Sequence, residues 1–470
     1  MTTMAQNQQL LKQLFELVEA SRGVVKQERV FERVKALVLA ELFAFARHTV
    51  TQLLMGLGQT EEDWSSWYRL FGGRFNYEHA SAVLVQETLR HVPAEAVYVV
   101  AGDATQTPRS SRSLEGVSWL RHPRTPPFHP GIHLAQRWFN GCWLAPAEAG
   151  YSRAFPIRWQ PAFTEASQAE AHPPKRESEA AVDFLGWLRA RLEANGRAGQ
   201  TLLLVGDGRY DSLPLWSALS GQAEETVVLV RSAKNRALYQ MPPEPGQARG
   251  RKRLYGARAP TPQALWQERT GWQRLTLSVR GRERPLQVKV RGPFLRRGAA
   301  GCPLFLIVVR GKDHGPVRRE PLPYLVNARR TSAGSWQLPL PLETLLFWAW
   351  QRWEIEVCHR ELKSNFGLGN KQCFNPIAAV TSVQWSAWVY TLFLLAGYRT
   401  FGLARAGDHP TRWWPGAYRW SFNSLWRSYR AAFWQHHEFL ALCTPFPANW
   451  GEKEVLLAAL RNAVLAAARA

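Results

Sequence analysis

The sequence predicts a mixed α/β fold with helical segments at both ends and a β-rich insertion near the middle. Two apolar runs, 97–103 and 201–207, have the composition of buried strands, and each ends on an aspartate. An amphipathic segment at 177–195 lies between them, and alternating β patterns fill much of residues 235–340. Together these patterns indicate a sheet covered by helices, interrupted by an insertion.

Residues 1–92 are predicted to form a separate helical domain. Apolar side chains recur at helical spacing from Val30 to Phe43, and a polar run at 58–63 breaks the pattern. Pro93 then introduces the strand that ends at Asp103.

Residues 93–234 are predicted to form the first part of an α/β core. Asn140-Gly141 predicts a tight turn that joins two strands into a hairpin, and Gly196 predicts the end of a helix. The expected elements are a strand at 97–103, hairpin strands at 133–139 and 142–145, a helix at 177–195, and strands at 201–205 and 226–230. This order is that of a ribonuclease H-like core that still lacks its last helix.

The missing helix is expected in residues 341–400, the second part of the core. It follows an insertion at 235–340 whose strands are predicted at 274–280, 285–291 and 303–310, and a helical C-terminal region is predicted at 401–470. Within 351–363, Arg352, Glu356 and Lys363 stand at i, i+4 and i+11, so they line one face of a helix.

The chain carries 59 Lys and Arg against 37 Asp and Glu, a net charge of +22, which favours phosphate-rich partners. Charge alone would equally fit a ribosomal or membrane-surface protein. Of the 22 tryptophans, most are expected in the core, although indole rings also stack on bases. Five cysteines without a CxxC pair argue against a disulfide framework and a zinc site, so we expect a protein of a reducing cytoplasm.

Residues 372–398 carry no charge and are long enough on paper to cross a membrane. They contain several polar side chains, including Gln372, Asn375 and Gln384. We therefore expect a helix buried behind the helix at 351–363, and no membrane partner.

The segment around Glu356 resembles a known family. Arg352-x3-Glu356-x6-Lys363 matches three of the four fixed letters of the Tyr-x2-Arg-x3-Glu-x6-Lys signature of IS4-type DDE transposases. The runs 206–211 and 228–236 look like that group's second-Asp block and the strand after it, and 47–51 is similar to IS701-like transposases. Ala349 stands at the signature's tyrosine position, which puts that tyrosine's DNA contact in doubt.

The resemblance implies a DDE transposase in which Asp103, Asp207 and Glu356 hold two Mg²⁺ ions, with Mn²⁺ as a substitute. Water would cut the DNA strand at the end of the transposable element, and the freed 3′-hydroxyl would attack target DNA. Carboxylates from separate elements also suit Mg²⁺ on chemical grounds alone. The alternative is that both aspartates cap turns after strands, and Asp211 competes for the metal role.

The implied partners are double-stranded DNA at terminal inverted repeats and at the target, and a second copy of the chain in a homodimer on DNA. Residues 1–92 would bind DNA or support assembly. Trp350 and Trp353 are candidates for stacking on an unpaired base, although the buried face of the helix is their other expected place. The residues expected to contact DNA are Arg352, Lys363, Arg360, His359, Tyr210, Arg209, Arg249, Arg251, Lys252 and Arg253.

Arg352 and Lys363 could instead be ordinary surface charges paired with Glu354 and Glu361. Two other functions also remain open at this point. One is a domesticated transposase-derived DNA-binding protein, and the other is a metal-dependent endonuclease that cuts DNA without joining it.

Overall fold

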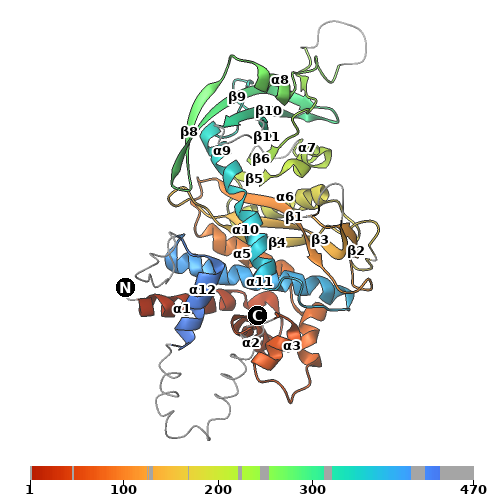
Figure 1. Cartoon of the computed structure of the whole chain (residues 1–470), viewed down its shortest axis with the longest axis vertical. Helices are drawn as coiled ribbons and strands as arrows, with labels where there is room; N and C mark the ends of the chain where they lie inside the picture. Colours follow the sequence, from red (N-terminus) through yellow and green to blue (C-terminus); the bar gives the residue numbers. More distant parts are fainter. Residues whose placement is uncertain are drawn as a thin grey trace.

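The computed structural model describes residues 3–44, 47–123, 125, 131–167, 169–220, 225–243, 253–311, 320–403 and 419–434. Within these ranges, eleven strands form one large sheet (Figure 1). They are β1 (Tyr98–Pro108), β2 (Val117–Arg121), β3 (Ile132–Leu144), β4 (Ala154–Pro161), β5 (Leu202–Gly206), β6 (Thr226–Arg231), β7 (Tyr239–Gln240), β8 (Gln273–Val279), β9 (Arg282–Arg296), β10 (Ala299–Gly311) and β11 (Leu322–Asn327).

The catalytic part of the sheet has the order β4-β3-β1-β5-β6. Strands β1, β3 and β4 are antiparallel neighbours, whereas β1, β5 and β6 run parallel. Parallel neighbours need crossover connections, and α6 (Glu177–Ala194) and α7 (Leu213–Ala218) supply them. The predicted α/β fold with a ribonuclease H-like core is confirmed by this strand order.

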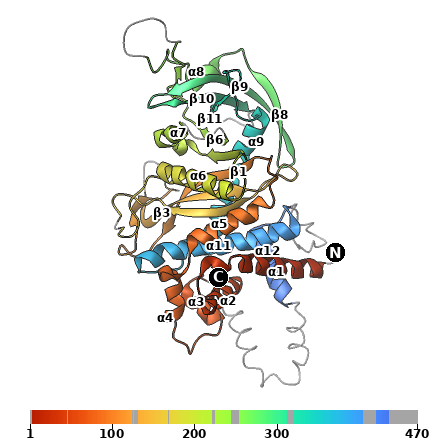
Figure 2. The same cartoon turned by 180° about the vertical axis from the view of Figure 1, so that it is seen from behind.

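Helices cover both faces of the sheet. Helix α6 packs on β3 and β4 from one side, while α9 (Leu342–Gln351) and α10 (Glu354–Ser364) lie on the other (Figures 1 and 2). Helix α9 contacts β5, β6 and β8, and α10 contacts β1, β4 and α11 (Pro376–Phe401). Together, α9 and α10 therefore run from the insertion to the helical base of the molecule.

The β-rich insertion continues the catalytic sheet. Strand β11 pairs antiparallel with β6, and β10 and β9 follow in order beyond it. The three strands predicted in this region correspond to β8, β9 and β10, and β9 runs on to Arg296. Helix α8 (Pro262–Gln267) packs on β10, and a small separate ribbon is formed by β12 (Arg329–Arg330) and β13 (Trp336–Gln337).

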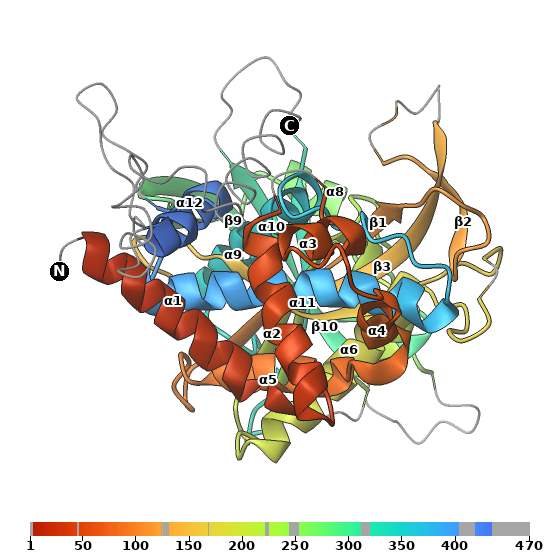
Figure 3. The same ribbon diagram turned by 90° about the horizontal axis from the view of Figure 1, so that it is seen from below.

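The helical base consists of N-terminal and C-terminal helices packed around α11 (Figure 3). Asn375 caps the start of α11 by accepting a hydrogen bond from the Ala378 N–H at 3.0 Å, and Pro376 occupies its first turn. The other helices are α1 (Thr3–Ala20), α2 (Glu28–Leu42), α3 (Val50–Gly56), α4 (Ser65–Arg69), α5 (Tyr77–Leu89) and α12 (Phe422–Trp434).

Among the described residues, α11 is the one helix long and apolar enough to cross a membrane, and 89% of its most apolar window is buried inside the protein. Its neighbours include α1, α5, α10, α12 and β4. It thus has the burial of a core helix, as its polar side chains predicted.

The hairpin prediction at Asn140-Gly141 is wrong. Strand β3 runs straight through both residues, and Asn140 is the cross-strand partner of Asp103. A Cβ atom built on Gly141 would lie 2.3 Å from the Phe184 ring, which requires glycine there for close packing of α6 on the sheet. Gly196, by contrast, follows the end of α6 with a φ of 72°, as predicted.

Candidate active site

Asp103 and Asp207 are brought together by two adjacent parallel strands. Gly102 on β1 and Gly206 on β5 are register partners, so the next residue of each strand is an aspartate at the same level of the sheet. Asp207 accepts a hydrogen bond from the Arg209 N–H at 2.8 Å and so caps the short 3₁₀ helix Gly208–Tyr210. Asp103 accepts one from the Ala104 N–H at 2.8 Å. Each therefore has one anchored carboxylate oxygen.

Glu356 comes to this point on the first turn of α10, which packs on β1 and β4. The predicted helix at 351–363 is interrupted, because α9 ends at Gln351 and α10 starts at Glu354. Arg352 lies at this break, yet its Nη2 donates a hydrogen bond to Glu356 Oε1 at 2.8 Å. Its Nη1 lies 3.8 Å from Asp103 Oδ2. Arg352 therefore joins two of the three predicted acids.

The electrostatics of Asp103 reflect this crowding of acids. Burial, and then the negative charge of Asp207, raise the pKa of Asp103 to about 7, and Glu356 contributes in the same direction. The positive charge of Arg352 opposes the rise. The carboxyl group of Asp103 is thus mostly buried beside other acids, and the positive charge of Arg352 offsets their negative charge only in part.

The chemistry of these side chains suits a hard divalent cation, because all three offer carboxylate oxygens. Within the described residues, however, no three His, Cys, Asp or Glu side chains lie close enough together to form a complete metal site as they stand. Arg352 holds Glu356 through their hydrogen bond, and Arg352 Nη1 is buried without a hydrogen-bond partner among the described residues. A cation could bind the acids if Glu356 and Arg352 rearranged.

Asp211, the rival candidate for the metal role, is committed elsewhere. Its side chain is fully buried and accepts hydrogen bonds from Ser232, Arg236 and Arg296 at 2.6, 2.6 and 2.8 Å. The Trp216 indole N–H donates another at 3.0 Å. This carboxylate neutralises two arginines, so it is not available to a metal ion.

Two residues predicted to contact DNA are buried, and those predictions are wrong. Tyr210 is 1% exposed and packs edge-on against Phe139. His359 lies on the sheet side of α10, where its Nε2 is 3.1 Å from the Asn140 amide nitrogen. Burial, with the nearby charges of Lys363 and Arg352, lowers the pKa of His359 to about 3. A neutral, enclosed imidazole of this kind cannot contact a phosphate.

The other predicted DNA contacts have varied surroundings. Arg360 and Arg253 are exposed, and Arg209 is exposed but ion-paired with Glu177 at 3.3 Å. Lys363 Nζ donates to Thr105 Oγ1 on β1 at 2.6 Å, so it lies along the same strand as Asp103. The remaining three, Arg249, Arg251 and Lys252, lie outside the described residues.

Glu354 and Glu361, considered above as partners of Arg352 and Lys363, form other ion pairs. Glu354 pairs with Arg280 at 3.0 Å and with Arg419 at 3.1 Å, while Glu361 pairs with Arg153 at 2.6 Å. These contacts fix α10 to the insertion, to the C-terminal segment and to the core. The alternative in which Arg352 and Lys363 are surface charges paired with Glu354 and Glu361 is therefore wrong.

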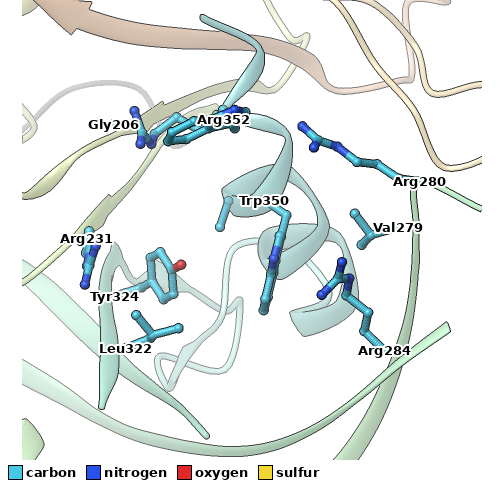
Figure 4. Close-up of a pocket in the computed structure, with 11 residues that line it drawn as sticks. Gly206, Arg231, Val279, Arg280, Arg284, Leu322, Tyr324, Trp350 and Arg352 are labelled. Carbon is cyan, nitrogen blue, oxygen red and sulfur yellow. The ribbon is translucent and has the colours of Figure 1, made fainter. Parts of the chain in front are cut away.

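A cavity of about 370 Å³ opens beside the acids (Figure 4). Gly206 and Arg352 belong to its wall, so it reaches the end of β5 and the break between α9 and α10. Trp353 is 51% exposed and Trp350 is half-buried. The lining residues are Gly206, Arg231, Val279, Arg280, Arg284, Leu322, Tyr324, Ala349, Trp350, Arg352 and Trp353.

Sequence reasoning missed three of these residues as site candidates: Arg280, Arg284 and Tyr324. The arginines lie at the end of the β8–β9 hairpin, where Arg280 adopts a positive φ of 55° before Gly281. The repeated Arg-x-Arg-x-Arg spacing at 280–284 was the available signal. Nothing in the sequence marks Tyr324, because its place depends on the pairing of β11 with β6.

A family model described as "DDE superfamily endonuclease" matches residues 25–285, which include Asp103 and Asp207 and end before Glu356. No curated protein sequence matches the chain significantly. Among solved structures, one titled "Cryo-EM structure of piggyBac transposase synaptic complex with hairpin DNA" is similar over 97% of this chain and 76% of its own, with 11% identity and a TM-score of 0.36. That likeness is too low to assign a fold, which rests here on strand order.

Proposed function

We propose a DNA-cutting function for this chain, which belongs to the DDE superfamily endonucleases. The observation that carries the proposal is the placement of Asp103 and Asp207 at the same level of two adjacent parallel strands, with Glu356 joined to Asp103 through Arg352. Acids from separate elements that meet in this way suit phosphoryl transfer assisted by metal ions.

Asp103, Asp207 and Glu356 are the residues that would hold the ions, for which we propose two Mg²⁺, replaceable by Mn²⁺. When bound, the ions would lower the pKa of a water or a 3′-hydroxyl and stabilise the oxygen that leaves phosphorus. Arg352 would release Glu356 and bind a DNA phosphate, because its planar fork can bond two oxygens. Lys363, beside Thr105 on β1, would place a second positive charge near the same strand.

The aromatic side chains of the cavity are suited to hold a base that has left the DNA duplex. Trp353 is exposed enough to stack on a base that has left the duplex, and Trp350 lines the same space. More specifically, we propose that the chain is a transposase of the IS4 or IS701-like group, which cuts at terminal inverted repeats and joins the 3′ ends to target DNA. It would act as a homodimer in the bacterial cytoplasm.

Cleavage of the DNA that borders the gene tests this function. The purified chain is incubated with end-labelled fragments of the flanking sequence and a supercoiled target plasmid, in Mg²⁺, in Mn²⁺ or in EDTA. Metal-dependent cuts at inverted repeats, followed by joining of the fragment to the plasmid, are expected. Cutting without joining would favour an endonuclease, and binding without cutting in either metal would favour a domesticated DNA-binding protein.

A further inference from the structure

Two donor side chains stand next to each other on the wall of the cavity. Arg231 at the end of β6 and Tyr324 on β11 are cross-strand partners. Side chains of such partners lie on the same face of a sheet, about 5 Å apart at their Cβ atoms. Because Val230 pairs with Gly206, Arg231 is also level with Asp207 on the neighbouring strand. Arg231 therefore lies one strand away from Asp207, and Tyr324 lies on the next strand beyond it.

Both side chains are available to a ligand. Within the described part of the chain, neither the Arg231 guanidinium nor the Tyr324 hydroxyl has a hydrogen-bond or ion-pair partner, and the same is true of Arg284. The other two arginines of the wall are engaged, Arg280 with Glu354 and Arg352 with Glu356. Figure 4 shows Arg231 and Tyr324 on one side of the cavity, with Arg280 and Arg284 on the opposite side.

The lining favours an anion with several acceptor oxygens. The described residues of the lining include four arginines and no acid. Burial raises the pKa of Tyr324, with the charges of Arg231 and Arg352 opposing the rise, so its hydroxyl keeps its proton and can donate at neutral pH. A guanidinium fork beside a phenol hydroxyl matches the oxygens of a phosphate, and the indole rings nearby suit the base of a nucleotide.

We infer that Arg231 and Tyr324 form a binding subsite for one backbone phosphate of the DNA strand that enters the cavity, with Arg284 facing that strand from the opposite side. The inference rests on the proposed function for the identity of its ligand. It assigns Arg231 and Tyr324 to strand positioning next to the acids, whereas the acids themselves would carry the cutting.

The test measures binding without catalysis. The anisotropy of a labelled single strand of about ten nucleotides, a length that single-strand grooves accommodate, is followed in EDTA over a range of salt concentrations. The full-length chain is compared with Arg231→Ala, Tyr324→Phe, Arg284→Ala and the double variant of the first two. Arg274→Ala is the matched control, because Arg274 is an exposed arginine of β8 outside the cavity lining.

Arg231→Ala is expected to weaken binding about tenfold and to reduce the slope of log K against log salt by about 0.7, the value for one phosphate on a single strand. Tyr324→Phe should weaken binding about threefold with the slope unchanged, since it removes a neutral donor. The double variant should lose less than the product of the two effects, because both residues contact one phosphate. Arg284→Ala should weaken binding, whereas Arg274→Ala should change it by less than twofold.

Equal behaviour of Arg231→Ala and Arg274→Ala, or an unchanged affinity in Tyr324→Phe, would overturn the subsite. That outcome is separate from failure of the proposed function. If the strand binds as expected but the wild-type chain never cuts DNA in Mg²⁺ or Mn²⁺, the subsite stands and the nuclease activity does not. If cutting occurs but Arg231 behaves like Arg274, only the subsite is wrong.

Discussion

Arg352 donates a hydrogen bond to Glu356 at 2.8 Å across the break between α9 and α10. The same guanidinium lies 3.8 Å from Asp103 Oδ2, so one arginine offsets the negative charge of an acid on β1 and of an acid on α10. Arg352 and a divalent cation would compete for the same carboxylates. In the proposed function, Arg352 at the break in the helix would leave Glu356 and bind a DNA phosphate.

Removing this arginine should strengthen metal binding and weaken DNA binding. In Arg352→Ala, Glu356 no longer has its hydrogen-bond partner, so Mg²⁺ should raise the thermal midpoint more than it does in the wild type, because ligands that bind the folded state stabilise it. DNA affinity should fall at the same time. The thermal midpoint with and without Mg²⁺ checks this, with Arg360→Ala as the control on the exposed face of α10. A smaller Mg²⁺ shift in Arg352→Ala than in the control would contradict the competition.

The buried carboxylate of Asp211 should matter for stability and not for metal binding. Asp211→Ala leaves Arg236 and Arg296 without their shared partner, and breaking a buried ion pair in this way typically costs about 3–5 kcal/mol. Chemical denaturation measures the loss. The folded Asp211→Ala variant should need the same Mg²⁺ concentration for half-maximal cutting as the wild type. If it needs a much higher concentration, Asp211 is a metal ligand after all.

His359 should make stability depend on pH. Its folded-state pKa of about 3 lies below the ordinary value of 6.5, so the neutral form stabilises the fold fully above pH 6.5, and this contribution is lost as the pH falls towards 3. Between pH 7 and pH 5 the loss is about 2 kcal/mol. The advantage of wild type over His359→Gln should therefore shrink by about that amount in urea unfolding at the two pH values. Parallel pH profiles would show that His359 is not enclosed.

Trp353 should act after the first cut. Its side chain is half exposed, so Trp353→Ala should change the thermal midpoint little, whereas a buried tryptophan would typically cost about 3–5 kcal/mol. We expect normal nicking with a slower following step, because a stacking face for an unpaired base is lost. Trp353→Phe should restore most of that step. If the Trp353→Ala variant is destabilised and already fails to make the first nick, the stacking role of Trp353 is contradicted.

The strands that carry Asp103 and Asp207 could be predicted because they depend on local patterns. A short apolar run that ends on an aspartate marks the end of a buried strand, and this held for Asp207 on β5. Asp103 differs, because β1 continues to Pro108 and the aspartate lies inside it. The helical spacing of Arg352 and Glu356 also survived, although the helix itself is broken between them.

The failures depend on contacts between distant segments. Asn140-Gly141 has the composition of a tight turn, but Gly141 serves the close approach of Phe184 from α6. His359 was expected to contact DNA, yet its side of α10 packs on Asn140. Tyr324 joins the cavity only through the pairing of β11 with β6. No periodicity within a single segment contains such information.

The most direct test of the central claim is metal-dependent cutting by three single variants: Asp103→Asn, Asp207→Asn and Glu356→Gln. Each substitution keeps the size of the side chain and removes a carboxylate that would hold a metal ion. Each should reduce cutting in Mg²⁺ and in Mn²⁺ to the level seen in EDTA, while DNA affinity and the thermal midpoint stay close to wild type. A folded variant that binds DNA and cuts it at the wild-type rate would show that its residue is not part of the catalytic site.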